Sequence, residues 1–194
     1  MVDFDLNLKD YAKINHVPIS FDETMEFIIK TINDNGLKTV LEIGTAIGFG
    51  SISMASFTCL EHIDTLEIDR EVHLEAVNNI NARNLSHKIT AHNVDAKEYI
   101  ASCDKKYDFI YLDGPKGQYI NYLPDLLRLL NDKGIIIADN VFFHGMVTGK
   151  TLVPSSCRSM IKGLHKFVEE ITLNPLLDSI IYNIGDGVAV IKKK

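Results

Sequence analysis

The stretch VLEIGTAIGFG, residues 40–50, decides the fold of this chain. A β-rich apolar run passes through the acidic Glu42 and then reaches Gly44, Gly48 and Gly50 within a few positions. Glycines crowded behind a strand indicate that a ligand comes close to the backbone. The spacing differs from the G-x-G-x-x-G of dinucleotide sites, and no phosphate-binding lysine follows as it would in a P-loop. Both kinds of nucleotide site therefore fit poorly.

Apolar strand-like runs alternate with amphipathic stretches along the chain. We predict strands at residues 38–44, 63–68, 88–93, 107–113, 133–139, 179–185 and 187–193. We predict helices at residues 22–34, 51–58, 70–84, 96–102, 118–131 and 155–172, and Ser20 with Glu23 predicts a capping box at the first of them. Buried apolar strands that alternate with helices predict an α/β fold with a doubly wound, mostly parallel seven-stranded sheet and an antiparallel C-terminal strand. We expect residues 1–194 to form a single domain.

Composition limits the class of protein. The chain has 194 residues, 46% of them hydrophobic, with no apolar run long enough for a membrane span and no apolar signal core at its start. Three cysteines without paired spacing indicate reduced thiols, so we expect a cytoplasmic protein. A net charge of −6 argues against non-specific nucleic-acid binding. The segment from Lys150 to Lys166 has basic residues but no acid, which indicates either a local basic face or a solvated helix face.

An acid stands at or directly after the end of each of the first five predicted strands. These acids are Glu42, Glu67, Asp95, Asp113 and Asp139. Ligands of doubly wound sheets bind beyond the carboxyl ends of the strands. The acids therefore mark the edge of the sheet where we expect a site.

The first three acids suit S-adenosylmethionine. An acid ahead of the glycine loop suits the amino group of a methionine moiety, and Glu67 at the end of the second strand suits two ribose hydroxyls. The adenine would then lie near Asp95 and Ala96. The alternative for the glycine loop is an ordinary tight turn.

The last two acids suit a metal. Asp113, Asp139 and Asn140 follow neighbouring strands, and two carboxylates with an amide oxygen form a hard site that suits Mg²⁺. The alternative is that Asp139 and Asn140 only cap a helix or form a turn. Lys116 lies three residues after Asp113. Near a divalent cation and a sulfonium its charged form would be disfavoured, so it could take a proton, although an isolated lysine is usually a surface residue.

These residues resemble the metal-dependent O-methyltransferases, the group of the catechol and caffeoyl-CoA O-methyltransferases, over nearly the whole chain. In that family an Asp, a Lys three residues later and an Asp-Asn pair hold Mg²⁺ and deprotonate a hydroxyl. The matching positions here are Asp113, Lys116, Asp139 and Asn140. The resemblance implies a class I methyltransferase fold, S-adenosylmethionine and Mg²⁺ as cofactors, and a homodimer.

Within this group the chain is most similar to the bacterial tRNA 5-hydroxyuridine methyltransferases. The similar stretches are HVPI (16–19), LEIGTAIGFG (41–50), EAVNNI (75–80), PKGQY (115–119), DNVFFHG (139–145) and GDGVAVIKKK (185–194). The resemblance implies methyl transfer to the 5-hydroxyl of 5-hydroxyuridine at the anticodon wobble position of tRNA. A small-molecule catechol or caffeoyl-CoA-type methyltransferase is the alternative, and a nucleotide-binding regulator without catalysis belongs to a different class.

The resemblance also implies roles for further residues. The implied cofactor contacts are Ile19, Ser20, Glu42, Gly44, Thr45, Gly50, Glu67, Asp95, Ala96 and Asp113. Relatives often have Ser at the position of Gly50, so a side-chain bond to the cofactor is lost there while the backbone N–H is kept. The residues that we expect to meet tRNA phosphates are Lys150, Arg158, Lys162 and Lys166.

Overall fold

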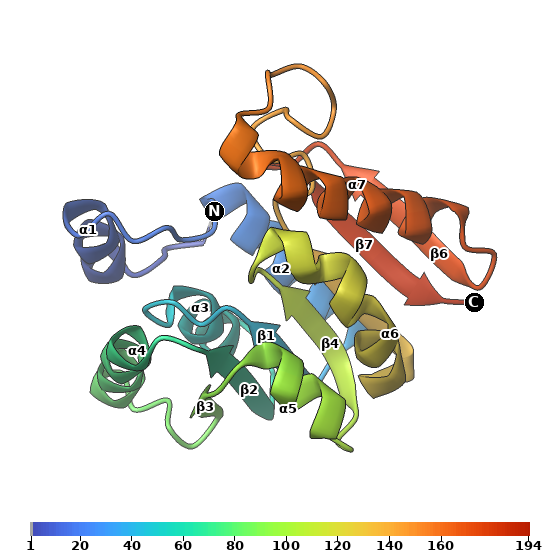
Figure 1. Cartoon of the computed structure of the whole chain (residues 1–194). Helices are drawn as coiled ribbons and strands as arrows, with labels where there is room; N and C mark the ends of the chain where they lie inside the picture. Colours follow the sequence, from blue (N-terminus) through green and yellow to red (C-terminus); the bar gives the residue numbers. More distant parts are fainter. Residues whose placement is uncertain (1) are drawn as a thin grey trace. The chain divides into compact units, whose positions relative to one another are not determined.

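A computed structural model describes residues 2–194 of the chain, which form two compact units, Met1–Tyr99 and Ile100–Lys194. In Figure 1 the first unit runs from blue to green and the second from yellow-green to red. Each unit contains its own part of the strands and helices that the sequence predicts.

The first unit consists of parallel strands and the helices that connect them. Its elements are α1 (Leu6–Ile14), α2 (Asp22–Asn35), β1 (Thr39–Ile43), α3 (Phe49–Phe57), β2 (His62–Glu67), α4 (Arg70–Ala82) and β3 (Ile89–Asn93). The strands follow the order β3-β2-β1, and both pairs are parallel, with Glu42 opposite Thr65 and Glu67 opposite Asn93. The carboxyl ends of β1 and β2 therefore lie at the same edge.

The second unit contains both parallel and antiparallel strands. After α5 (Ala96–Ser102), which crosses the unit boundary, its elements are β4 (Tyr107–Leu112), η1 (Lys116–Gln118), α6 (Tyr119–Leu129), β5 (Leu130–Ala138), η2 (Ser155–Cys157), α7 (Arg158–Leu173), β6 (Leu177–Tyr182) and β7 (Val188–Lys193). The order is β4-β5-β7-β6, with β4 parallel to β5 and β7 antiparallel to both of its neighbours. Helix α7 runs along β6 and β7 (Figure 1). The antiparallel C-terminal strand is as predicted.

Strands β1, β4 and β5 form much of the core of their units because most of their residues are buried on both faces. Residues 40–43 of β1 and 109–112 of β4 are all buried, as are 134–138 of β5. Such continuous apolar burial is typical of strands covered by helices on both sides. Among residues 2–194, no helix is long and apolar enough to cross a membrane.

Three local predictions differ from the structure. Helix α1 was not predicted, and its N-terminus is capped by the Asp5 carboxylate, which accepts the backbone N–H of Leu8. The N-cap of α2 is Phe21, which makes no side-chain capping bond, one residue after the predicted capping residue Ser20. Helix α6 was predicted to reach residue 131, but strand β5 already begins at Leu130. Leucines at 129 and 130 fit a buried helix end and a buried strand start equally well.

A close contact between α7 and η1 fixes the loop that carries Lys116. A Cβ atom added to Gly163 in α7 would lie 2.6 Å from the backbone oxygen of Gly117 in η1. A Cβ added to Gly117 would in turn lie 3.2 Å from the Cα of Met160. The backbones approach so closely that neither position has room for a side chain.

We therefore predict that Gly163→Ala lowers the stability of the protein, although Ala is the better helix former. The added methyl group must push two backbones apart, a kind of overpacking that costs about 1–3 kcal/mol. Thermal and urea unfolding measure the loss, with Ser159→Ala at an exposed position of the same helix as the matched control. A Gly163→Ala variant as stable as that control would contradict the prediction.

Candidate active site

In the first unit, the glycine loop leads from β1 into α3 with a backbone that favours glycine. Gly44 and Gly48 have φ angles of 101° and 89°, in the left-handed region. The N–H groups of Gly44 and Thr45 both lie 3.1 Å from the carbonyl of Leu66 in β2. A Cβ on Gly48 would lie 3.3 Å from the Ile52 side chain. The glycines are thus needed for the path of the loop itself, whatever ligand it meets.

Glu42 lies in a buried chain of hydroxyl bonds. Its side chain is 1% exposed, and the Thr65 hydroxyl donates to its carboxylate at 2.6 Å. The Thr45 and Thr65 hydroxyl oxygens also lie 2.6 Å apart. Because the Thr65 proton goes to Glu42, Thr45 must donate to Thr65. This chain fixes the carboxylate of Glu42 beneath the loop, and its role toward the cofactor stays a prediction.

Glu67 and Asp95 bind backbone amides at the same edge of the first unit. One oxygen of Glu67 accepts the N–H of Ala46 in the glycine loop, and the other accepts the N–H of Asp69, both at 3.0 Å. Asp95 accepts the N–H of Lys97 at 2.8 Å, one residue after Ala96 begins α5. Glu67 therefore links the end of β2 to the glycine loop, a contact that the sequence did not predict.

The other predicted cofactor residues lie at the starts of helices. Ile19 and Ser20 are half-buried just before α2, whereas Gly50 is buried in the first turn of α3. Their contact with a cofactor stays a prediction.

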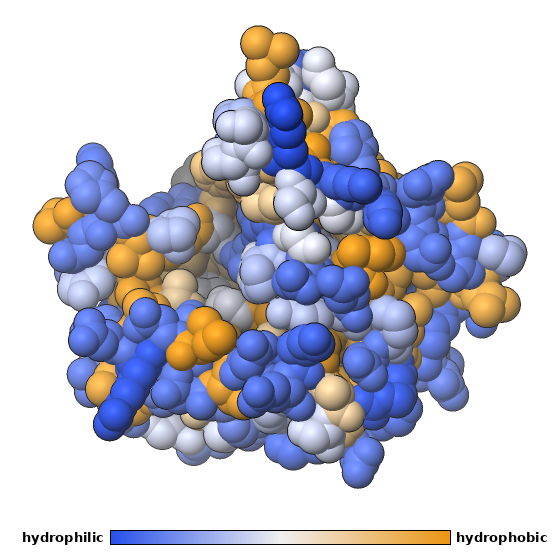
Figure 2. All heavy atoms as spheres, in the orientation of Figure 1, coloured by the Kyte–Doolittle hydropathy of each residue, from blue (hydrophilic) through white to orange (hydrophobic). Residues whose placement is uncertain are grey.

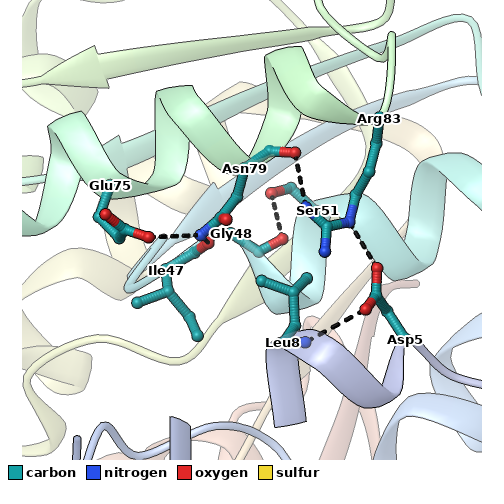
Figure 3. A network of polar contacts seen from close by, with 8 residues as sticks. All are labelled: Asp5, Leu8, Ile47, Gly48, Ser51, Glu75, Asn79 and Arg83. Carbon is teal, nitrogen blue, oxygen red and sulfur yellow. Dashed lines mark hydrogen bonds and ion pairs between the residues drawn. The ribbon is translucent and has the colours of Figure 1, made fainter. Parts of the chain in front are cut away.

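A polar network from α4 supports the glycine loop (Figure 3). The Asn79 side chain donates to the carbonyl of Ile47 in the loop at 3.0 Å. Arg83, one turn later, donates to the carbonyl of Asn79 at 3.0 Å and forms an ion pair with Asp5 at 2.5 Å. The hydrogen bond from Arg83 lowers the pKa of Asp5. Residues far apart in the sequence thus hold the loop and the start of α1. The only sequence feature that pointed to this part of α4 was the stretch EAVNNI, which contains Asn79.

In the second unit, the two carboxylates of the predicted metal site face one hydroxyl group. Asp113 directly follows β4, and Asp139 directly follows β5. The Tyr111 hydroxyl lies 3.0 Å from Oδ2 of Asp139 and 3.4 Å from Oδ2 of Asp113. The neighbouring strand ends therefore bring the two acids together, as the sequence predicted.

Lys116 is bound to this cluster. Its ammonium lies 2.5 Å from Oδ1 of Asp113 and 5.5 Å from the centre of the Tyr119 ring. Burial acts to lower the pKa of Lys116, but Tyr119 and the carboxylate of Asp113 raise it by more, so the net pKa is raised. The expectation of a readily neutral Lys116 concerned a site that also holds a divalent cation and a sulfonium, so it stays a prediction. Lys116 can accept a proton only when another cation shares the charge of Asp113.

Asp139 is the most buried acid of the cluster, with 0% of its surface exposed. Burial and then the nearby charge of Asp113 raise its pKa to about 6, while Lys116, the N–H of Asn140 and the Tyr111 hydroxyl lower it. The N–H of Asn140 donates to Oδ1 of Asp139 at 2.7 Å. A fully buried carboxylate with so high a pKa is typical of functional sites.

The corner that follows Asp139 has a strained backbone. Asn140, Phe143 and His144 have φ angles of 56°, 43° and 53°, a region that non-glycine residues rarely adopt. The carboxylate of Asp186 accepts the N–H of His144 at 2.7 Å, and the carbonyl of Asp186 accepts the N–H of Phe142 at 2.9 Å. The turn before β7 thus holds the corner that presents Asn140. The sequence showed this turn only as a Gly-Asp-Gly connection.

The donor set of the cluster fits a hard divalent cation. Two carboxylates from adjoining strand ends and a neighbouring carboxamide are oxygen ligands of the kind that Mg²⁺ prefers. Within the described residues, 2–194, no three His, Cys, Asp or Glu side chains are grouped as a metal site. Only two acids contribute here, so the remaining ligands would be Asn140, water and substrate oxygens.

The basic residues predicted to meet RNA lie on the surface of the second unit. Arg158, Lys162 and Lys166 are exposed and recur every four residues of α7, so they share one face of the helix. Lys150 is exposed in the segment before α7. Figure 2 shows strongly hydrophilic residues over the first turns of α7. Their spacing suits a row of phosphates, and RNA contact stays a prediction.

Asp139→Asn should stabilise the protein in the presence of a chelator at pH 7.5. The raised pKa means that the folded state binds more protons than the unfolded state between the ordinary value of 3.8 and about 6, so stability falls as pH rises through that window. At pH 7.5 the charged Asp139 carboxylate lowers the free energy of unfolding by about 1–3 kcal/mol, and the neutral amide of Asn avoids this loss. Chemical unfolding at pH 4, 5, 6 and 7.5 measures the difference, with the exposed Asp178→Asn as the matched control. An equal gain at every pH would contradict the prediction.

Comparison with known proteins agrees with the fold. A family model described as O-methyltransferase matches residues 6–194. The chain is 26% identical to caffeoyl-CoA O-methyltransferase 1 of Arabidopsis thaliana, over 87% of this chain and 68% of that protein. A crystal structure described as a putative caffeoyl-CoA O-methyltransferase from Staphylococcus aureus is 30% identical, covers 97% of this chain and 91% of its own, and has a TM-score of 0.90.

A second solved structure shows the fold alone. It is an O-methyltransferase from Bacillus cereus in complex with SAH, 22% identical, with a TM-score of 0.85 over 100% of this chain and 93% of its own. The predicted fold class is confirmed by these likenesses: an α/β, Rossmann-like methyltransferase fold with a mixed sheet and an antiparallel C-terminal strand. The match over residues 6–194 shows that this chain belongs to the O-methyltransferase family.

Proposed function

We propose that this protein is a Mg²⁺-dependent methyltransferase that uses S-adenosylmethionine to methylate the 5-hydroxyl of 5-hydroxyuridine at the wobble position of tRNA, which gives 5-methoxyuridine. The observation that carries the catalytic part is the meeting of Asp113 and Asp139 at the Tyr111 hydroxyl, with Lys116 bound to the same cluster. This arrangement supplies a cation site and a proton acceptor together, which is what deprotonation of a hydroxyl requires.

The methyl donor is supported by the family and by the first unit. The O-methyltransferase from Bacillus cereus, which shares this fold, was solved with SAH. In this chain the Glu67 carboxylate lies at the end of β2, beside the glycine loop to which it is hydrogen-bonded. In the proposal, Glu67 binds the ribose hydroxyls and the glycine loop receives the methionine end of the donor.

The metal would be held by Asp113, Asp139 and Asn140. When bound, Mg²⁺ supplies Lewis-acid chemistry that lowers the pKa of the substrate hydroxyl. It would also share the negative charge that keeps Lys116 protonated. Asp113, Asp139 and Asn140 would hold the acceptor oxygen beside the cation, and Asp139 itself is fully buried.

The chemical step is a direct transfer. The neutral amine of Lys116 takes the hydroxyl proton, so an O–H bond breaks and an N–H bond forms. The resulting oxyanion attacks the methyl carbon in line, an O–C bond forms, and the C–S bond of the donor breaks to leave S-adenosylhomocysteine. The target base must leave its stack to reach the acceptor oxygen, which costs least in a single-stranded anticodon loop.

A small-molecule acceptor is the second candidate. The chain is similar to caffeoyl-CoA O-methyltransferase 1, and its net charge of −6 does not favour RNA. The tRNA proposal is supported by the acid-free segment 150–166, which presents four exposed basic residues. Both candidates share every catalytic residue and differ only in the acceptor.

Incubation with labelled S-adenosylmethionine and tRNA from a strain that lacks the modification tests the proposal. We expect 5-methoxyuridine among the nucleosides of the digested tRNA, loss of the product with EDTA, and recovery with excess Mg²⁺. Asp139→Ala should lower the rate about 100-fold or more, because a lost cation site removes several kcal/mol of transition-state stabilisation. Equal or faster methylation of free catechols would favour the second candidate, and activity unaffected by EDTA would refute the metal.

Removal of the basic face of α7 should weaken tRNA binding. The triple variant Arg158→Ala, Lys162→Ala, Lys166→Ala is expected to raise KM for tRNA about tenfold or more, to flatten its salt dependence, and to leave kcat nearly unchanged. The control variant replaces the exposed Lys97, Lys105 and Lys133 with Ala, which makes the same change in net charge. If both triple variants raise KM equally, α7 has no specific role in RNA binding.

A further inference from the structure

The hydroxyl of Tyr111 has an unusual environment for a buried tyrosine. The residue lies in β4 and is 1% exposed, so its ring belongs to the core. Its oxygen lies 3.0 Å from Asp139 and 3.4 Å from Asp113, on oxygens that belong to two different strand ends. A phenol has a single proton to donate. The shorter distance assigns that proton to Asp139, with Asp113 as a second acceptor at the limit of hydrogen bonding.

Each of the two carboxylates is held on its other oxygen by a different donor. Oδ1 of Asp139 accepts the backbone N–H of Asn140 at 2.7 Å. Oδ1 of Asp113 accepts the ammonium of Lys116 at 2.5 Å. The remaining oxygen of each acid, Oδ2, faces the Tyr111 hydroxyl. This shared partner fixes the two carboxylates relative to one another.

We propose that Tyr111 is a positioning residue for the divalent cation of this site. The inference rests on the proposed function, because it concerns the cation that Asp113 and Asp139 would hold. Donors behind ligating carboxylates fix their orientation and tune the metal. A hydroxyl bonded to a carboxylate is a charge-assisted donor, stronger than one bonded to a neutral acceptor. Without it, the like charges of the buried Asp139 and the half-buried Asp113 would turn away from each other.

A purely structural role predicts something different. If Tyr111 served only to fill the core, its ring would be sufficient and the hydroxyl would change stability alone. Tyr107 provides the comparison, because it lies on the same strand, is 2% exposed, and has its hydroxyl 3.9 Å from Sγ of Cys103 rather than near the acids. Removal of either hydroxyl leaves a ring of the same shape at the same depth.

Binding of Mn²⁺ to Tyr111→Phe and Tyr107→Phe, measured by electron paramagnetic resonance, tests the inference. We expect the dissociation constant for Mn²⁺ to rise about tenfold or more in Tyr111→Phe, as for other residues behind metal ligands, and to change less than about twofold in Tyr107→Phe. Calorimetric binding of S-adenosylmethionine should be unchanged in both variants. In the methyl-transfer assay, Tyr111→Phe should need more Mg²⁺ for half-maximal rate, while its kcat at saturating Mg²⁺ stays near that of the wild type.

The possible failures are distinguishable. Tight Mn²⁺ binding by the wild type and equally tight binding by Tyr111→Phe would overturn the inference but leave the proposed function intact. An equal loss in both variants would also overturn it, because the loss would then reflect the core. If the wild type binds no Mn²⁺, the metal of the proposed function fails, and the role of Tyr111 fails with it. Thermal unfolding of both variants shows whether the fold is retained.

Discussion

Two carboxylates that follow adjacent parallel strands, Asp113 and Asp139, face the same buried hydroxyl. Their mutual repulsion and the burial of Asp139 are unfavourable, and burial is the first cause of its raised pKa. Lys116, the N–H of Asn140 and the Tyr111 hydroxyl offset part of this cost. A fold does not need such a cluster for stability, and a divalent cation would neutralise it directly. The cluster thus lowers the stability of the folded protein, as residues that serve catalysis often do.

The rest of the second unit keeps this cluster in place through backbone contacts. Gly163 lets α7 approach η1 so closely that the loop bearing Lys116 has no room to shift. Asp186 binds the N–H groups of the strained corner after Asn140. In the first unit, Asn79 and Glu67 perform the same task for the glycine loop by binding Ile47 and Ala46. In both units, side chains distant in sequence fix a loop at the carboxyl edge of the strands.

The sequence predicted the order of strands and helices and the meeting of Asp113 with Asp139, because both follow from local pattern and from parallel pairing. It could not predict α1, whose position depends on the contact between Asp5 and Arg83, residues 78 apart in the chain. The contacts of Tyr111 and Asn79 could not be predicted for the same reason. The periodicity of a strand or a helix indicates which positions are buried but not which group a polar atom binds. The ion pair of Lys116 with Asp113 has no signal in the sequence beyond the spacing of three residues, and the loss of the lysine charge beside a cation stays a prediction.

Diffraction from crystals grown with Mn²⁺, with data collected for its anomalous signal, tests the central claim most directly. The account predicts one strong peak within about 2.0–2.3 Å of oxygens from Asp113, Asp139 and Asn140. A peak elsewhere, or none among these three residues at saturating Mn²⁺, would contradict it.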